Sequence, residues 1–402
     1  MSAREFTFPQ GDAAQLGFSA TGLDRLAGAL RREIEQRTFP GAVLLVGRDG
    51  RIAIDLALGV QDEKTGAPMR PDSLFRIYSM TKAITSTLAL MLMEDGRLQL
   101  DDPVSKYIPA FASPKVATFD DGSLVAVGSD RQISIHSLFL HTSGLSHEML
   151  ETPVQSIYAR AQLARRDRTN EELAEAIAAL PLLCTPGTQW NYSRSIEVLG
   201  RVIEVITGQT LGDAMRDRIF DPLGMTDTGF HAVPSDAEDR LAEPFAVDPW
   251  TDRPVSLFDM RQKPAFEAGG GGLVSTAPDY ARFAQMILNG GELNGTRILG
   301  SRTVRFMLSD HLSPEITHRP EPLPPGYGFG LGFAIRTEAG LSPNPGSVGQ
   351  FFWNGVAGTQ FWGDPLEGLW AILMVQAPGQ REYIRSLIRN LVYGALEDRP
   401  AG

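Results

Sequence analysis

The chain has 402 residues, more than one small domain requires, so we expect one large domain or two intertwined ones. With 43% hydrophobic and 21% charged residues the composition is that of a globular protein, and a net charge of -11 disfavours a nucleic-acid partner, because phosphate binding needs a basic surface. No apolar run approaches the roughly 18 residues of a membrane span and no apolar leader follows Met1, so we expect a cytoplasmic protein without a membrane partner.

Cysteine and histidine give no support for a metal centre. Cys184 is the only cysteine, so no intramolecular disulfide can form, and none of the six histidines belongs to an H-E-x-x-H pair. We therefore expect neither a metal nor another cofactor.

The first part of the chain predicts a helix followed by a strand hairpin. The helix spans residues 19–37, because an apolar stripe at helical spacing runs through it: Leu23, Leu26, Leu30 and Ile34. Two apolar runs, residues 42–46 and 52–56, flank the turn signal Arg48-Asp49-Gly50. Nothing helical separates these runs, so we expect them to pair antiparallel.

The middle of the chain predicts mainly helices. One helix begins near Ser79 and ends at Gly96, with apolar residues at helical spacing between them. Residues 111–130 indicate a loop-rich segment. Apolar periodicity and a capping box place further helices over residues 133–140, 169–180 and 196–206.

The last third of the chain predicts strands between two helices. The glycine run Gly269 to Gly272 precedes a helix over residues 278–288, and a helix over residues 382–396 closes the chain. Between these helices lie strand-like runs at residues 329–335, 350–353, 357–362 and 369–375.

These elements favour an α+β fold with one antiparallel sheet. The N-terminal hairpin and the C-terminal strands would share the sheet, and the two terminal helices would cover it. We expect residues 1–75 and 265–402 to form this sheet domain and residues 76–264 to form a mainly helical domain. Ser79 would then lie at the seam between them, a usual place for a functional site.

The stretch Ser79-Met80-Thr81-Lys82 has the pattern S-x-x-K at the start of a helix. Two residues three apart on a helix share a face, so Lys82 can approach the Ser79 hydroxyl. The free N–H groups and the dipole of the first turn favour developing negative charge, and a nearby amine can take the serine proton. Taken alone, a serine at this position is more often a helix cap.

Two further segments supply groups that acyl transfer needs. Tyr192 stands just before the helix over residues 196–206, and a phenol near an ammonium has a lowered pKa, so Tyr192 is a candidate acid or base. Trp353-Asn354-Gly355 is strand-like but interrupted by glycine, which often marks the close approach of a ligand. The backbone N–H groups of Ser79 and Val356 are candidates for an oxyanion hole.

Together these segments resemble the three motifs of class C β-lactamases and serine penicillin-recognising enzymes. The order and spacing of Ser79-Met80-Thr81-Lys82, Tyr192-Ser193-Arg194 and Trp353-Asn354-Gly355 match that superfamily. The resemblance extends from about Leu23 to Leu396 and implies a β-lactamase/transpeptidase-like fold with Ser79, Lys82 and Tyr192 as catalytic residues.

Two departures from the β-lactamase motifs point to one branch of the superfamily. Arg194 stands where the second motif has asparagine, and Trp353 stands where the third motif has a lysine that attracts the β-lactam carboxylate. A Trp-x-Gly third motif resembles the family VIII carboxylesterases, whose implied substrates are short-chain esters. The resemblance then implies substrate binding by Arg194, Trp353, Asn354 and Gly355, and an aromatic wall suits a neutral ester.

The mechanism that this resemblance implies proceeds through an acyl-enzyme. Ser79 attacks the ester carbonyl while Lys82 or Tyr192 takes its proton, and the N–H groups of Ser79 and Val356 hold the oxyanion. Tyr192 passes a proton to the leaving alkoxide, and water or an alcohol then cleaves the acyl-enzyme. Lys82 and Tyr192 both stay open as the resting base.

Several rival interpretations remain open or lack support. The usual esterase elbow, G-x-S-x-G, does not occur, so a Ser-His-Asp triad has no anchor, and His141 and His147 are interpreted as part of a polar loop. The run Gly269 to Gly272 lacks a following G-K-[ST], which favours a tight turn over a phosphate site. Open alternatives are a β-lactamase, a D-amino-acid peptidase, an acyltransferase and a non-enzymatic scaffold.

Overall fold

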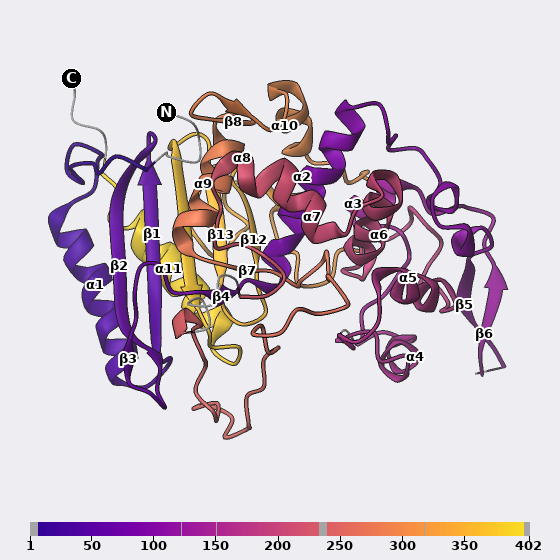
Figure 1. Cartoon of the computed structure of the whole chain (residues 1–402), viewed down its shortest axis with the longest axis horizontal. Coiled ribbons are helices and arrows are strands. Elements are labelled where there is room, and N and C mark those ends of the chain that lie inside the picture. Colours follow the sequence, from indigo (N-terminus) through magenta and orange to yellow (C-terminus); the bar gives the residue numbers. More distant parts are fainter. Residues whose placement is uncertain (1–6, 122, 150, 233–238, 317, 398–402) are drawn as a thin grey trace.

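The fold centres on one antiparallel sheet (Figure 1), seen in a computed structural model that describes residues 7–121, 123–149, 151–232, 239–316 and 318–397. The strand order is β10-β11-β12-β13-β14-β1-β2-β3. The strands of this sheet are β1 (Gly41–Arg48), β2 (Arg51–Asp62), β3 (Ala67–Pro68), β10 (Tyr327–Phe329), β11 (Ala334–Arg336), β12 (Phe351–Asn354), β13 (Gln360–Asp364) and β14 (Leu369–Val375).

The first and last parts of the chain meet in the middle of this sheet. β1 pairs antiparallel with β14 from Ala42↔Val375 to Arg48↔Leu369, and with β2 through the predicted hairpin. Every residue of β1 and β14 is buried, because both faces of the sheet are covered, and this explains their continuous apolar sequences. The predicted α+β fold with a shared sheet is confirmed.

Helices cover both faces of the sheet. α1 (Ala20–Glu35) packs on β2 and on α11 (Arg381–Tyr393), and α9 (Ala277–Leu288) packs on β1, β13 and β14. α1 begins after Ser19, whose Oγ accepts a hydrogen bond of 3.2 Å from the Gly22 N–H, as an N-cap does. Figure 1 shows α1 beside the sheet and, at the opposite end of the molecule, the helical part.

The helical part surrounds α2 (Thr81–Glu94), whose residues from Thr81 to Leu92 are all buried. Its other helices are α3 (Ile135–Phe139), α4 (Gln155–Arg160), α5 (Asn170–Ala178), α6 (Ser195–Thr207), α7 (Leu211–Met215), the π-helical η5 (Arg216–Phe220) and α8 (Asp221–Leu223). Short 3-10 helices are η2 (Tyr78–Met80), η3 (Val104–Lys106) and η4 (Pro109–Phe111). Among the described helices, none is both long and apolar enough to cross a bilayer.

Small paired strands and one helix complete the fold. β4 (Phe75–Arg76) pairs with β7 (Val274–Ser275), and β8 (Glu292–Leu293) pairs with β9 (Thr296–Arg297) before α10 (Ser301–Met307). The pair of β4 and β7 ties the strand before Ser79 to the glycine run after residue 268. The predicted domain boundaries at residues 75/76 and 264/265 stay a prediction.

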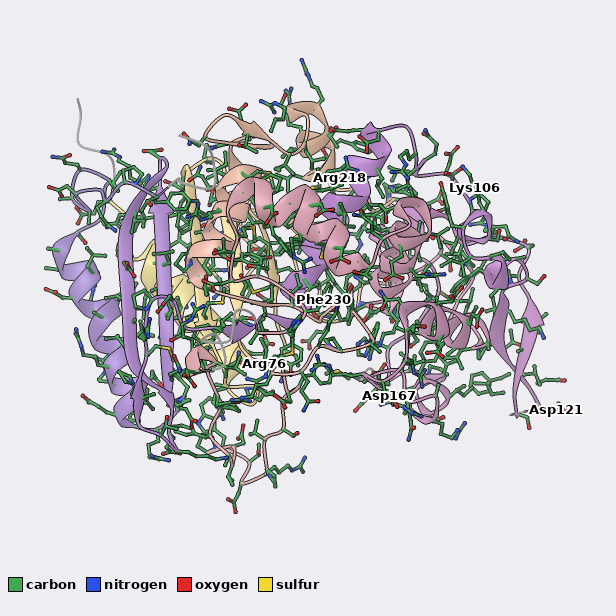
Figure 2. The ribbon with its side chains drawn as sticks, in the orientation of Figure 1. Arg76, Lys106, Asp121, Asp167, Arg218 and Phe230 are labelled. Atoms are coloured by element: carbon green, nitrogen blue, oxygen red, sulfur yellow. The ribbon has the colours of Figure 1, made fainter. Side chains whose placement is uncertain are left out.

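Three expectations about local structure need correction. The segment 111–130 is not mainly loop, because β5 (Lys115–Asp120) and β6 (Ser123–Gly128) form a hairpin there, with Asp121 at its tip in Figure 2. The predicted strand at 329–335 is two strands, β10 and β11, separated by a turn in which Gly332 has a φ of 99°. The run at 357–362 enters a strand only at Gln360, because a turn precedes it.

Candidate active site

Ser79 lies in a tight turn directly before α2. It is the middle residue of η2, and Tyr78 before it has a φ of 43°, in the left-handed region that non-glycine residues rarely adopt. Contacts on both sides hold this turn: the Tyr78 hydroxyl accepts from the Phe258 N–H (3.2 Å), and the Tyr280 hydroxyl donates to the Met80 carbonyl (2.9 Å). Such over-determined, strained turns cluster at functional sites.

The strand before Ser79 is anchored by a buried arginine. Arg76 of β4 donates to the carbonyl oxygens of Phe258 (2.5 Å) and Ala242 (2.9 Å) and forms an ion pair with Glu243 (3.1 Å). Figure 2 shows Arg76 between the sheet and the long loop that precedes the glycine run. The turn that carries Ser79 is therefore fixed from the β4 side as well as by its own contacts.

Lys82 is buried beside Ser79. Its Nζ lies 3.3 Å from Ser79 Oγ and donates a hydrogen bond of 2.6 Å to the Gly270 carbonyl. A Cβ at position 270 would come closer than 3.0 Å to the Glu197 carboxylate, so a larger residue there would have to displace that side chain. The glycine run thus places a backbone acceptor beside the S-x-x-K lysine.

Tyr192 completes a three-residue cluster. Its hydroxyl donates to Ser79 Oγ at 2.6 Å, and the Lys82 ammonium lies 4.6 Å from the centre of its ring. The structure therefore brings together the side chains of Ser79, predicted as the nucleophile, and of Lys82 and Tyr192, either of which is predicted as the resting base. Their catalytic roles stay a prediction.

Two histidines flank Tyr192, a placement that the sequence analysis missed. His141 lies 4.8 Å from the tyrosine ring and His147 stacks on it at 5.9 Å. Burial first, and then the positive charge of Lys82 for His141 or of Arg194 for His147, holds the pKa of each imidazole well below 6.5. Both imidazoles are therefore neutral neighbours of Tyr192. The segment is a loop between helices, as predicted, but its two histidines are buried against the Tyr192 ring.

The third motif lies at the end of β12, beyond the pairing of this strand with β11. β11 pairs with β12 only at Phe351 and Phe352, so the edge of β12 beyond them is free of β11. A Cβ at Gly355 would lie closer than 3.0 Å to the Ile77 carbonyl oxygen, so glycine lets this segment approach the chain two residues before Ser79. Within the described residues, the N–H groups of Ser79 and Val356 donate no hydrogen bond.

The residues predicted to bind substrate are placed differently from one another. Trp353 is buried with its ring 5.6 Å from Tyr192, so it faces the cluster. Asn354 follows it on the strand, and alternation places its side chain on the opposite face. Their roles in substrate binding stay predictions.

Arg194 is locked in a buried ion cluster. It forms ion pairs with Glu148 and with Glu197, the latter at 2.8 Å. Burial would lower the pKa of Arg194, but the two carboxylates outweigh it and raise that pKa, so the guanidinium is permanently charged. Arg194 therefore supports the segment that carries Tyr192. Because both of its carboxylate partners neutralise its charge, Arg194 has no free charge with which to make the predicted contact with substrate.

The described residues contain no group of three or more histidine, cysteine, aspartate or glutamate side chains arranged to hold a metal ion. The groups gathered at Ser79 suit a different chemistry. A hydroxyl with two proton-carrying neighbours can attack a carbonyl, and backbone N–H groups without an acceptor in the described residues can stabilise an oxyanion.

A serine at the start of a central helix, between an antiparallel sheet and a helical part, defines the β-lactamase/transpeptidase-like fold. The chain belongs to the beta-lactamase family, because the family profile described as Beta-lactamase matches residues 26–393. The resemblance inferred from the motifs is therefore confirmed.

Known proteins similar to this chain include two esterases. Esterase EstB of Burkholderia gladioli is 31% identical over 414 residues, covering 95% of this chain and 99% of that protein. Lovastatin esterase of Penicillium rubens is 33% identical over 294 residues, covering 67% and 72%. The solved structure of EstCE1, described as a hydrolase with promiscuous acyltransferase activity, superposes with a TM-score of 0.78 at 26% identity, covering 95% and 99%.

Proposed function

We propose that this protein is a family VIII carboxylesterase that cleaves short-chain esters through an acyl-enzyme on Ser79. The observation that carries the proposal is the contact of Ser79 Oγ with both Tyr192 (2.6 Å) and Lys82 (3.3 Å). The esterase relatives support the reaction class.

The proposed reaction begins with attack of Ser79 Oγ on the ester carbonyl. The serine proton passes to Lys82 or Tyr192, of which Tyr192 lies nearer to Ser79 Oγ. The N–H groups of Ser79 and Val356 hold the oxyanion. Tyr192 then protonates the leaving alkoxide, and water attacks the acyl-enzyme to release the acid and regenerate Ser79.

The charges around the site favour a neutral substrate. Arg194 is neutralised by two carboxylates, and Trp353 carries no charge at the position where β-lactamases have a lysine. A substrate carboxylate would find no counter-ion at either position and would lose its hydration. A small ester without charge near the carbonyl avoids this cost.

The test is a p-nitrophenyl ester series of increasing acyl length, assayed on wild type and on Ser79→Ala. We expect wild type to prefer short acyl chains and the variant to lose activity by about 10⁴-fold or more, as nucleophile removal does in other serine hydrolases. Far-UV circular dichroism shows that the variant is folded. Full activity of folded Ser79→Ala would refute the proposed nucleophile.

Two alternative activities share the same acyl-enzyme. Nitrocefin assayed beside p-nitrophenyl butyrate tests the β-lactamase alternative, and turnover of nitrocefin that is faster by orders of magnitude would refute the ester assignment. The description of EstCE1 favours acyl transfer as the second candidate. Adding a short alcohol and measuring ester formed against acid released separates transfer from hydrolysis. D-amino-acid peptidase activity and a cytoplasmic location stay predictions.

A further inference from the structure

The oxyanion donor Val356 N–H belongs to the same peptide unit as the Gly355 carbonyl. A peptide unit is planar and trans, so its N–H and C=O point in opposite directions. Whatever fixes the Gly355 carbonyl therefore also fixes where the Val356 N–H points. This matters because glycine rotates freely, and a peptide next to glycine has little intrinsic preference for one orientation.

Two donors fix the Gly355 carbonyl. The Gly358 N–H donates to it at 3.0 Å across a tight turn, and the Arg385 guanidinium donates to it from α11 through Nη2. Arg385 is 7% exposed, and its Nη1 is held by Glu382 at 2.7 Å. Helix α11 thus supplies a buried cation that contacts the third motif at Gly355.

Arg385 keeps its charge in this environment. Burial lowers its pKa to about 10, with Glu382 acting in the opposite direction, so the guanidinium remains protonated at neutral pH. A charged donor makes a shorter and stronger hydrogen bond than a neutral one. It also polarises the peptide, which strengthens the N–H on its far side as a donor.

We propose that Arg385 is a positioning residue for the oxyanion hole, acting through the Gly355–Val356 peptide. It holds the carbonyl on the α11 side and thereby aims the Val356 N–H at the reacting carbonyl above Ser79. This inference rests on the proposed ester hydrolysis. It assigns Arg385 no contact with substrate.

The chain offers a matched control one helical turn further along α11. Arg389 is also buried, but it donates to the Tyr327 hydroxyl (3.3 Å) and packs on the rings of Phe352 and Trp362, at 4.7 and 5.3 Å. Its removal changes the packing of the same helix without touching the Gly355 carbonyl. A merely structural role for Arg385 would make the two substitutions equivalent.

The experiment compares Arg385→Met, Arg385→Lys and Arg389→Met by p-nitrophenyl butyrate kinetics, thermal unfolding and inhibition by phenylboronic acid. The boronate adds to the serine oxygen and places a charged tetrahedral oxygen in the hole, so its affinity reports the hole itself. We expect Arg385→Met to lower kcat/KM about 10- to 100-fold, less than loss of a whole oxyanion donor. The inhibition constant should rise by a similar factor, with KM little changed.

Arg385→Lys should recover part of the activity, because an ammonium can still donate to the Gly355 carbonyl. If Arg385→Met does not fold, Arg385→Lys is compared with Arg389→Met in its place. Arg389→Met should keep kcat/KM within about twofold of wild type, as substitutions outside the site do. Equal losses in Arg385→Met and Arg389→Met, or an unchanged boronate affinity in Arg385→Met, would overturn the inference. Wild type that neither cleaves the ester nor reacts with a fluorophosphonate would refute the proposed function instead.

Discussion

At the scale of single residues, Gly355 shows how sterics determine the geometry of the site. A Cβ at this position would come closer than 3.0 Å to the Ile77 carbonyl oxygen and to Thr359 Oγ1. The carbonyl belongs to the backbone and cannot rotate away, so any larger residue must push the end of β12 away from the turn that carries Ser79. Glycine is therefore required by close approach and not by backbone conformation.

Gly355→Ala should lower activity more than stability. We expect kcat/KM for p-nitrophenyl butyrate to fall about 10- to 100-fold, because a shift of about 1 Å at the oxyanion donor misaligns the reaction. The free energy of unfolding should fall by about 1–3 kcal/mol, as in other overpacked sites. Urea unfolding and steady-state kinetics measure the two effects.

Gly340→Ala is the matched control for this substitution. No atom lies within 4 Å of a Cβ at Gly340, so its unfolding free energy should stay within about 0.5 kcal/mol of wild type. Wild-type kcat/KM in Gly355→Ala would mean that β12 does not press against the turn that carries Ser79.

The sequence predicted the reacting residues better than their surroundings. Ser79, Lys82 and Tyr192 belong to short motifs that can be recognised in a single sequence, and the structure brings the three side chains together. The position of Arg194 in a buried ion cluster depends on Glu148, 46 residues away in the sequence, and no local pattern encodes that pairing. Arg385 likewise meets Gly355 only through the packing of α11 on the sheet.

At the scale of elements, two helices start with the same cap but in opposite electrostatic environments. Thr276 caps α9 by accepting from the Asp279 N–H (3.3 Å), and Thr210 caps α7 by accepting from the Asp213 N–H (3.1 Å). Asp279 is buried, and this burial raises its pKa to about 7. Asp213 is more exposed, and its hydrogen bond from Arg216 lowers its pKa.

Asp279→Asn should make the protein more stable at high pH relative to wild type. Between about pH 4 and 7 the native Asp279 holds a proton that the unfolded chain has released, so wild-type stability falls as pH rises through this window. The amide cannot ionise, so the variant loses this dependence, worth up to about 1.4 kcal/mol per pH unit. Urea unfolding at pH 5 and pH 8 measures it.

Asp213→Asn provides the comparison of opposite sign. A lowered pKa stabilises the native state above about pH 4, so this variant should lose a little stability relative to wild type as pH rises through that value. The same pH trend in both variants would contradict the assigned environments.

The missed hairpin of β5 and β6 shows where element prediction from sequence was incomplete. Asp121-Gly122 is a hairpin signal between alternating residues, and the sequence alone contained it. The division of residues 329–335 into β10 and β11 was harder to predict, because an apolar run does not reveal a turn inside it. The central strands were predictable, since burial on both faces leaves continuous apolar sequences.

At the scale of the whole molecule, the sheet and the helical part share one hydrophobic core. The same cluster of buried residues contains Val46 and Trp370 from the sheet and Leu138 and Ile177 from the helical part. Lys82 is bonded across the seam to Gly270. Lys82 and its neighbours at the seam are therefore held by the shared core and not by a hinge.

On heating, the protein should lose its activity and its folded structure at the same temperature. We expect the midpoint of activity loss, assayed at temperature with p-nitrophenyl butyrate, to lie within about 2 °C of the far-UV circular dichroism midpoint. Tryptophan fluorescence reports the site more closely, because Trp190 and Trp353 lie within about 6 Å of His141 and Tyr192 respectively. Activity lost well before either signal would show that the seam opens on its own.

The shortness of β11 has a consequence for the surroundings of the third motif. Because β11 pairs with β12 only at Phe351 and Phe352, the third motif continues past the end of this pairing. A longer β11 would extend this pairing along the third motif without replacing Ser79, Lys82 or Tyr192. The length of β11 is thus a feature of the third motif's surroundings that can change while Ser79, Lys82 and Tyr192 stay in place.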